Sequence, residues 1–454
     1  MNILMMSNTY TPLVGGLERS VMSFAKAYRS RGHSVRIVAP FFRGMPRRER
    51  GVTRVPAIPN VGGSPYSVQL PIPYLLRHVV KTFRPDIVHA HHPFLLGDTA
   101  LRVAALDQVP FVFTHHILFE QYTRCLLPLR TSVAQRFVID LATGFANLCD
   151  RIFAPSHSVA DLLEKRGVTV PIDIVPTGVD LARFMGGNRP QLRKAAGVPP
   201  DAFVVGHLGR LAPEKNLQFL ATSVVSFMRG EPRAWFVVAG QGPGEAMIQQ
   251  LCQEAGVGDR LRCLGDLQGH WLADAYHLMD VFAFASQSET QGLVLVEAMS
   301  AGVPVVAVDA PGVRDIVIDG QNGRLLPTEN AEQFTEALTW MSHRTPAQRD
   351  AMRQGIKTTS KRLSMTLCAD RALKIYAELI ATSQKTGPHD ARPWARAKRW
   401  FHTEVRIFKK TLHAARALVE EAGVHVKPHD SPTRQAPEHG ALDRVRQSVE
   451  MTHE

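Results

Sequence analysis

The chain has 454 residues, 45% of them hydrophobic, and this length allows two or three domains with large cores. A formal net charge of +12 favours an anionic partner, such as a phosphorylated ligand, an acidic membrane surface or nucleic acid. Because the sequence has neither zinc-knuckle spacing nor a basic–aromatic RNA-binding signature, we expect no nucleic-acid partner.

The amino-terminal residues MNILMMSNTY contain no basic leader and no long apolar segment, so we expect no secretory signal. No stretch reaches the roughly 18 consecutive apolar residues that a membrane-spanning helix needs. Five cysteines are scattered without CxxC spacing, which is typical of reduced core residues. These features together predict a cytoplasmic location.

The first half of the chain alternates short apolar strands with helical patterns. A helix is predicted from Glu18 to Arg31. The predicted strands are residues 2–7, 34–40, 86–92, 109–115 and 151–156. Such alternation predicts a parallel sheet covered by helices on both faces, so residues 1–185 are predicted to form a Rossmann-like domain.

The same alternation restarts after a Gly-, Pro- and Arg/Lys-rich connecting region at about residues 180–200. The predicted strands of this second half are residues 203–210, 234–242, 261–266, 281–286 and 303–309. We therefore predict an α/β fold with two doubly wound domains, the second at residues 200–365. Ligands bind at the carboxyl ends of the strands in open parallel sheets, so substrates are expected in a cleft between the two sheets.

The carboxyl-terminal region differs from both halves. A helix at residues 366–385 is predicted to pack back towards the first domain. Residues 386–454 are predicted to form a basic aromatic helix followed by a polar, partly disordered tail, the latter from about residue 426. The basic aromatic helix has two interpretations: an interfacial membrane helix, or a surface helix that packs on its own domain.

Two carboxylates, Glu289 and Glu297, interrupt the otherwise apolar stretch SETQGLVLVEAMSAG. Eight helical positions separate them by about 12 Å, whereas two carboxylates that act on one glycosidic bond lie roughly 5–9.5 Å apart. We therefore expect each to bind hydroxyls at one end of an elongated ligand. The amides of Gly292 and Leu293, at the start of the helix between them, suit a phosphate group.

A second candidate motif is GRLAPEKN, which follows a predicted strand and contains Arg210 and Lys215. A guanidinium offers two parallel hydrogen bonds and an ammonium offers a compact charge, so together they suit a diphosphate. The alternative is two unrelated surface cations.

Gly15 and Gly16 form a turn after the first strand, where a backbone without side chains can approach a ligand closely. The turn is not GxGxxG, so a nicotinamide cofactor has little support. His115 and His116 follow a buried strand, but adjacent strand residues point to opposite faces. HAHH, at residues 89–92, has no evident carboxylate partner, and we predict no metal site.

Taken together, these segments resemble the retaining glycosyltransferases of family four, whose fold is GT-B. The resemblance covers roughly residues 1–380, and the segment THHILFEQYTR further resembles the subgroup that glycosylates diacylglycerol. The motifs that carry it are HLGRLAPEKN, VVAGQGPG, LGDLQG, SETQGLVLVEAMSAGVPVV and PGVRDIVIDGQNGRLL.

The resemblance implies a role for each matching residue. Glu289 would contact sugar hydroxyls and Glu297 the ribose, while Arg210 and Lys215 would hold the diphosphate. His116 would contact the donor sugar near the reacting centre. The catalytic set would consist of Arg210, Lys215, Glu289 and His116. Gly15, Gly16, Gly292 and Leu293 would complete the donor site, and His115 and Glu120 are candidates for the acceptor side. Gln291 stands where the family often has an aromatic residue, which could alter the sugar preference.

The implied activity is transfer of a hexose, with retention, from a UDP- or GDP-sugar to a hydroxyl of a lipid or lipid-linked acceptor, without a cofactor. Residues 41–50, residues 74–83 and the basic tail predict peripheral binding to the inner face of the cell membrane through anionic lipids. Two alternatives stay open: a soluble sugar or polysaccharide acceptor, and a nucleotide-sugar hydrolase or epimerase on the same fold.

Overall fold

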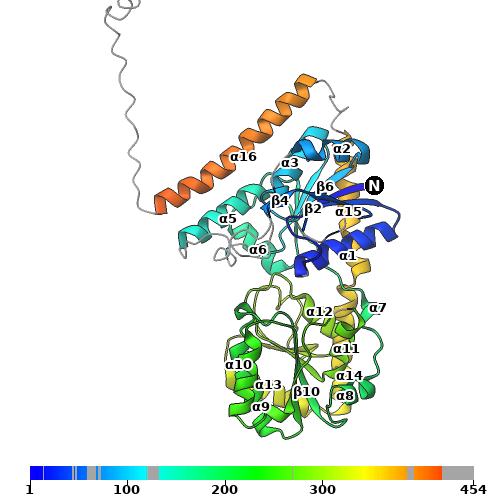
Figure 1. Ribbon diagram of the computed structural model, residues 1–454, viewed down its shortest axis with the longest axis vertical. Coiled ribbons are helices and arrows are strands. Elements are labelled where there is room, and N and C mark those ends of the chain that lie inside the picture. The colour runs from blue at the N-terminus through cyan, green and yellow to red at the C-terminus, as the bar shows by residue number, and fades with distance from the viewer. Residues whose placement is uncertain are drawn as a thin grey trace, which may run out of the picture.

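The computed structural model describes residues 1–13, 15–42, 45, 49–58, 68–69, 73–118, 120, 132–267, 269–385 and 393–421. These residues form two α/β domains, one above the other in Figure 1, and a long helix that lies along the first domain. The predicted α/β fold with two doubly wound parallel sheets is confirmed. The polar segment from about residue 426 lies outside the described residues.

The first domain is built on a seven-stranded parallel sheet with the order β3-β2-β1-β6-β7-β8-β9. A separate antiparallel pair joins β4 (Ala57–Ile58) to β5 (Val68–Gln69). The strands of the large sheet are β1 (Asn2–Met6), β2 (Ser34–Pro40), β3 (Val52–Val55), β6 (Ile87–Ala90), β7 (Phe111–Thr114), β8 (Arg151–Ala154) and β9 (Ile172–Ile174). Its helices are α1 (Gly16–Ser30), α2 (Pro73–Phe83), α3 (Leu96–Asp107), α5 (Ser132–Ala146) and α6 (His157–Lys165).

The second domain is built on a six-stranded parallel sheet with the order β12-β11-β10-β13-β14-β15. Its strands are β10 (Phe203–Leu208), β11 (Ala234–Ala239), β12 (Leu261–Cys263), β13 (Val281–Phe284), β14 (Val305–Val308) and β15 (Gly323–Leu326). Its helices are η3 (Pro213–Lys215), α9 (Leu217–Gly230), α10 (Gly244–Glu254), η4 (Gly258–Arg260), α11 (His270–Leu278), α12 (Leu293–Ser300), α13 (Ala331–Ser342) and α14 (Pro346–Arg362).

The sequence did not predict five of the strands in the described residues: β3, β4, β5, β9 and β15. β9 has the sequence IDI and β15 has the sequence GRLL, so neither is a continuous β-branched run. The connecting region also contains two short helices, α7 (Leu181–Phe184) and α8 (Arg189–Ala195). Phe184 and Val198 are buried in the core of the second domain, so this region packs as part of that domain.

The chain passes between the domains twice, and the two passages lie against each other. Val179 donates its N–H to Leu363 (3.0 Å) and accepts from Met365 (2.9 Å). A Cβ on Gly178 would lie 2.4 Å from Cα of Met365, so only glycine fits at this crossing.

The helix after the crossing, α15 (Met365–Lys385), returns to the first domain. It packs on α1, and its residues Cys368, Ala372 and Tyr376 are buried in the core beside that helix. The next helix, α16 (Pro393–Glu421), lies along α5 and α3 of the first domain (Figure 1). No helix in the described part of the chain is long and apolar enough to cross a membrane.

The docked face of α16 combines apolar contacts with two ion pairs. Thr403, Ile407, Lys410 and Ala414 are buried, and their spacing of four, three and four residues places them on one stripe. Nζ of Lys410 lies 2.7 Å from Oδ1 of Asp98 in α3, and its side chain is only 2% exposed. Arg102 of α3 forms a two-pronged pair with Glu404 at 2.6 and 3.0 Å.

Replacing Lys410 with Ala should lower the free energy of unfolding by about 3 kcal/mol, because it leaves the mostly buried carboxylate of Asp98 unpaired. Urea denaturation followed by circular dichroism measures this change. The matched control is Lys409→Ala, since Lys409 is the exposed neighbour on the same helix and should change stability by less than about 0.5 kcal/mol. Equal effects of the two variants would contradict a docked α16.

Candidate active site

Each sheet reverses its strand order next to its first strand. In the second domain the reversal lies between β10 and β13, because β11 and β12 continue on one side and β14 and β15 on the other. In the first domain it lies between β1 and β6. The loops that follow such a strand pair diverge and leave room for a ligand, so the residues after β1, β6, β10 and β13 form the candidate site.

The residues after β10 and β13 meet as an ion pair. Lys215, at the end of η3, contacts the carboxylate of Glu289 in the loop after β13, and both side chains are mostly buried. Arg210, directly after β10, contacts Glu214 and is more exposed, with 55% of its side chain accessible. The structure therefore brings together the two predicted diphosphate ligands and the predicted sugar ligand at one switch point.

Helix α12 begins at the same place. Its N-cap is Gly292, whose φ of +78° is a left-handed conformation that favours glycine. Glycine has no side chain to cap the helix, and the first turn contains no acidic residue. The backbone N–H groups of Leu293 and the residues after it can therefore donate hydrogen bonds to an anion.

Glu297 occupies the second turn of α12 and is buried. The hydroxyl of Tyr276 donates to its Oε2 at 2.8 Å, and Nη1 of Arg19 lies 3.4 Å from its Oε1. Burial raises the pKa of Glu297 above its ordinary value, although Arg19, the Tyr276 hydrogen bond and Arg183 act in the opposite direction. Arg19 belongs to α1, so this ion pair joins the two domains.

Further hydrogen bonds hold the loop after β13 against the first domain. Ser156 donates its hydroxyl to the carbonyl of Thr290 (2.8 Å), and the hydroxyl of Thr290 donates to the carbonyl of His116 (2.7 Å). In addition, Asp315, which follows β14, accepts three hydrogen bonds at the start of α6, from the amides of His157 and Ser158 and the hydroxyl of Ser158. The predicted His116 is thus adjacent to the Glu289 loop.

The other predicted residues have different surroundings. His115 is buried with its ring edge-on to Phe113, and burial lowers its pKa to about 3. Glu120 pairs with Arg166 at 2.6 Å. His115 and Glu120, the two candidates for the acceptor side, thus both contact other residues of the first domain.

Gln291 joins the domains. Its side-chain oxygen accepts from the amide of Thr177 (2.8 Å), and its side-chain nitrogen donates to the carbonyl of the same residue (2.7 Å). Both ends of the Gln291 amide are therefore bonded to the backbone of the other domain, and the effect of this residue on sugar preference stays a prediction.

At the turn after β1, Gly15 is the N-cap of α1. A Cβ on Gly16 would meet no atom within 4 Å, so there is open space beside the backbone at this position. The described residues contain no group of three or more His, Cys, Asp or Glu side chains arranged to hold a metal ion.

Comparison with known proteins assigns both domains to sequence families. Residues 14–183 match the family described as Glycosyltransferase Family 4, and residues 188–358 match Glycosyl transferases group 1. The chain belongs to glycosyltransferase family 4. Its architecture of two facing parallel-sheet domains is the GT-B fold.

The relatives of this glycosyltransferase include enzymes named for different acceptors and donors. It is 27% identical to the alpha-monoglucosyldiacylglycerol synthase of Acholeplasma laidlawii, over 71% of this chain and 84% of that protein. It is 30% identical to a GDP-mannose-dependent alpha-mannosyltransferase of Mycolicibacterium smegmatis, over 73% and 86% respectively. The crystal structure of Anabaena HepE in complex with UDP has the same fold, with a TM-score of 0.64, 22% identity, and coverage of 83% of this chain and all of that one.

The sequence interpretation of this glycosyltransferase missed Arg19 and Tyr276. A signal for Arg19 existed, because a cation in the first turn of a helix opposes the helix dipole and needs another reason to be there. The sequence contained no comparable signal for Tyr276, because a tyrosine among apolar residues in a helix is typical of a core residue. Its partner Glu297 lies 21 positions away, and only the fold brings the two together.

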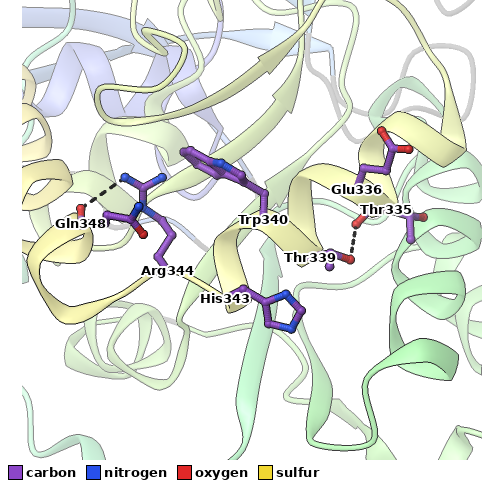
Figure 2. Close-up of a pocket in the computed structure, with 7 residues that line it drawn as sticks. All are labelled: Thr335, Glu336, Thr339, Trp340, His343, Arg344 and Gln348. Carbon is purple, nitrogen blue, oxygen red and sulfur yellow. Dashed lines mark hydrogen bonds between the residues drawn. The ribbon is translucent and has the colours of Figure 1, made fainter.

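A hollow of about 510 Å³ lies elsewhere, at the junction of α13 and α14 (Figure 2). The guanidinium of Arg344 covers the ring of Trp340 at 3.9 Å there, and its Nη2 donates to the carbonyl of Gln348. None of the predicted donor ligands lines this hollow.

Replacing Glu297 with Gln should preserve or raise the melting temperature at neutral pH while weakening donor binding. A carboxyl whose pKa is raised by folding stabilises the protein fully only below its ordinary pKa of 4.5, and this contribution is lost as the pH rises through the folded value. Gln removes the ionised form but can still accept from Tyr276.

Thermal unfolding at pH 7.5 and at about pH 4.5 tests this, and the advantage of the variant should disappear at the lower pH. Glu332→Gln, at an exposed position of α13, is the control. A clearly lower melting temperature of Glu297→Gln at pH 7.5 would show that this carboxylate is structural.

Proposed function

We propose that this glycosyltransferase moves a hexose from a UDP- or GDP-sugar to a hydroxyl of a lipid or lipid-linked acceptor, with retention of the anomeric configuration. The observation that carries the proposal is the meeting of Lys215, Glu289 and the start of α12 at the switch point of the second sheet. A diphosphate would lie at Arg210, Lys215 and the amides of Gly292 and Leu293, the sugar at Glu289, and the ribose at Glu297.

The ion pair between Lys215 and Glu289 suits a site that exchanges partners. Without a ligand, each charge is balanced by the other in a mostly buried position. A bound diphosphate would take over the ammonium, and sugar hydroxyls would donate to the freed carboxylate. The site would then keep every buried charge paired in both states, which low-dielectric surroundings require.

In this proposal, catalysis comes from stabilising the leaving diphosphate. The bond between the anomeric carbon and the phosphate oxygen breaks, and negative charge develops on that oxygen. Arg210 and Lys215 would stabilise this charge, and the departing phosphate would accept the proton of the acceptor hydroxyl as it attacks from the same face. No covalent nucleophile is required.

Lys215→Ala should lower kcat by about a hundred- to thousandfold, because it removes a cation that acts mainly in the transition state. A radiolabelled donor and lipid extract measure the turnover. Lys194→Ala, at an exposed position on α8 of the same domain, should have the activity of the unaltered chain. Unchanged kinetics in Lys215→Ala would contradict the proposal.

The lipid acceptor is supported by the outer face of α16. Phe401 and Phe408 are 62% and 65% exposed, Leu412 is also exposed, and their spacing of seven and four residues places them on one stripe. Exposed Lys398 and Lys409 lie on the same outer side of the helix. Exposed aromatic residues beside cations suit the interface of an anionic membrane.

This arrangement combines the two sequence interpretations of the basic helix. One face of α16 packs on α3 and α5, and the opposite face would bind lipid. Half of the basic loop at residues 41–50 lies outside the described residues. In residues 74–83, the exposed side chains include Arg77 and Lys81 of α2, which would extend the cationic surface of the first domain.

Replacing both Phe401 and Phe408 with Ser should weaken binding to phosphatidylglycerol vesicles by at least about tenfold, because two apolar side chains no longer enter the interface. Vesicle sedimentation measures the binding. Trp271→Ser removes an equally exposed aromatic residue from the second domain and is the control. Equal binding of all three proteins, or equal binding to phosphatidylcholine vesicles, would contradict membrane docking by α16.

The remaining alternatives differ in product. Transfer to a soluble sugar with no requirement for lipid would favour a soluble or polysaccharide acceptor. Release of free sugar as the main product would favour a hydrolase, and conversion of the donor sugar without release would favour an epimerase.

A further inference from the structure

Buried histidine rings form a continuous contact in the first domain, at the ends of β6 and β7. Nδ1 of His91 lies 2.9 Å from Nε2 of His116, and the two rings are stacked at 5.2 Å. The ring of His91 also packs on that of His89, with centroids 4.3 Å apart. Three polar rings therefore connect the interior of the domain to the residue predicted to touch the donor sugar.

The interior end of this contact is fixed by Tyr376 on α15. Its hydroxyl accepts from Tyr28 (3.4 Å) and lies 2.5 Å from Nδ1 of His89. Burial raises the pKa of Tyr376 and lowers that of His89 to about 3, so the phenol keeps its proton and the imidazole is neutral. Tyr376 therefore donates to Nδ1, and His89 carries its proton on Nε2, 2.7 Å from the hydroxyl oxygen of Thr114.

The proton on His91 can be placed by the same reasoning. Nε2 of His91 is buried without a hydrogen-bond partner in the described part of the chain. An unpaired lone pair is less unfavourable there than an unpaired N–H group. Burial and the neighbouring histidines lower the pKa of His91 and His116 well below the ordinary value, so both rings are neutral. The proton of His91 then lies on Nδ1, which donates to Nε2 of His116.

We propose that His91, packed on the ring of His89, which is itself hydrogen-bonded to Tyr376, is a positioning residue that holds His116 as a neutral hydrogen-bond donor with its proton on Nδ1. Because Nε2 of His116 accepts from His91, only Nδ1 is left for a substrate, and it presents an N–H group. Such a group suits a sugar hydroxyl or ring oxygen and does not act as a general base. This inference rests on the proposed function, in which His116 contacts the donor sugar.

The network also connects α15 to the boundary between the domains. The carbonyl of His116 is bonded to Thr290 beside Glu289, so His116 lies where the domains meet. Tyr376 lies 12 residues after the crossing at Ser364 and Val179 and is buried in the core beside α1, where it reaches His89. Helix α15 thereby supports the orientation of the His116 ring, through Tyr376, His89 and His91.

Two substitutions at one position test the hydrogen bond itself. His91→Leu removes it, whereas His91→Asn keeps a polar nitrogen the same number of bonds from Cβ as Nδ1. His91→Leu should lower kcat by about tenfold, the equivalent of one neutral hydrogen bond, with the donor KM within about twofold of that of the unaltered chain. His91→Asn should recover most of this loss, and Tyr376→Phe should have a smaller effect in the same direction.

His343→Asn, at an exposed position between α13 and α14, is the control and should leave kcat unchanged. Thermal unfolding of each variant separates loss of fold from loss of positioning. An unchanged kcat in His91→Leu would overturn the inference. So would a folded His91→Asn that is as inactive as His91→Leu.

Histidine-ring ¹⁵N NMR of the full chain tests the proton positions without any turnover. The signals of His116 are assigned by their absence in His116→Gln. We expect a protonated Nδ1 and a bare Nε2 at pH 7, and the reverse arrangement would overturn the inference. If no donor supports transfer by the unaltered chain, the proposed function fails while this spectrum still decides the tautomer.

Discussion

The reversal of strand order beside the first strand of each sheet determines where this protein can place a ligand. At these two points, β1 beside β6 and β10 beside β13, successive loops diverge and their side chains and amides stay open. The residues predicted to hold the diphosphate and the ribose follow β1, β10 or β13, and His116 follows β7, the strand next to β6. The mutual pairing of Lys215 and Glu289 is a direct result, since β10 and β13 are hydrogen-bonded neighbours.

The domains are joined by contacts that involve the same loops. Glu297 pairs with Arg19 of α1, Thr290 bonds to His116, and Gln291 bonds to the crossing segment at Thr177. A change in the distance between the domains would therefore act on the residues that flank the donor. The double crossing at Gly178 and the return of α15 limit how the two domains can separate, because both passages are bonded to each other.

Much of this could be predicted from the sequence. The alternation of apolar strands and helices predicts both sheets, and the spacing of Glu289 and Glu297 around a glycine helix start predicts an elongated ligand. The pairing of Glu297 with Arg19 and Tyr276, and the contact of His116 with His91, could not be predicted, because each joins residues brought together only by the packing of separate elements. The short strands β9 and β15 were missed for a local reason, since their polar and glycine residues hide the apolar pattern.

The most direct test of the central claim is a crystal structure of the chain with a non-hydrolysable UDP- or GDP-sugar. We predict the diphosphate within hydrogen-bonding distance of Arg210, Lys215 and the amides of Gly292 and Leu293. Glu297 would bind the ribose, and Lys215 would be released from Glu289. A donor bound away from the start of α12, or one that leaves the pair of Lys215 and Glu289 intact, would contradict the account.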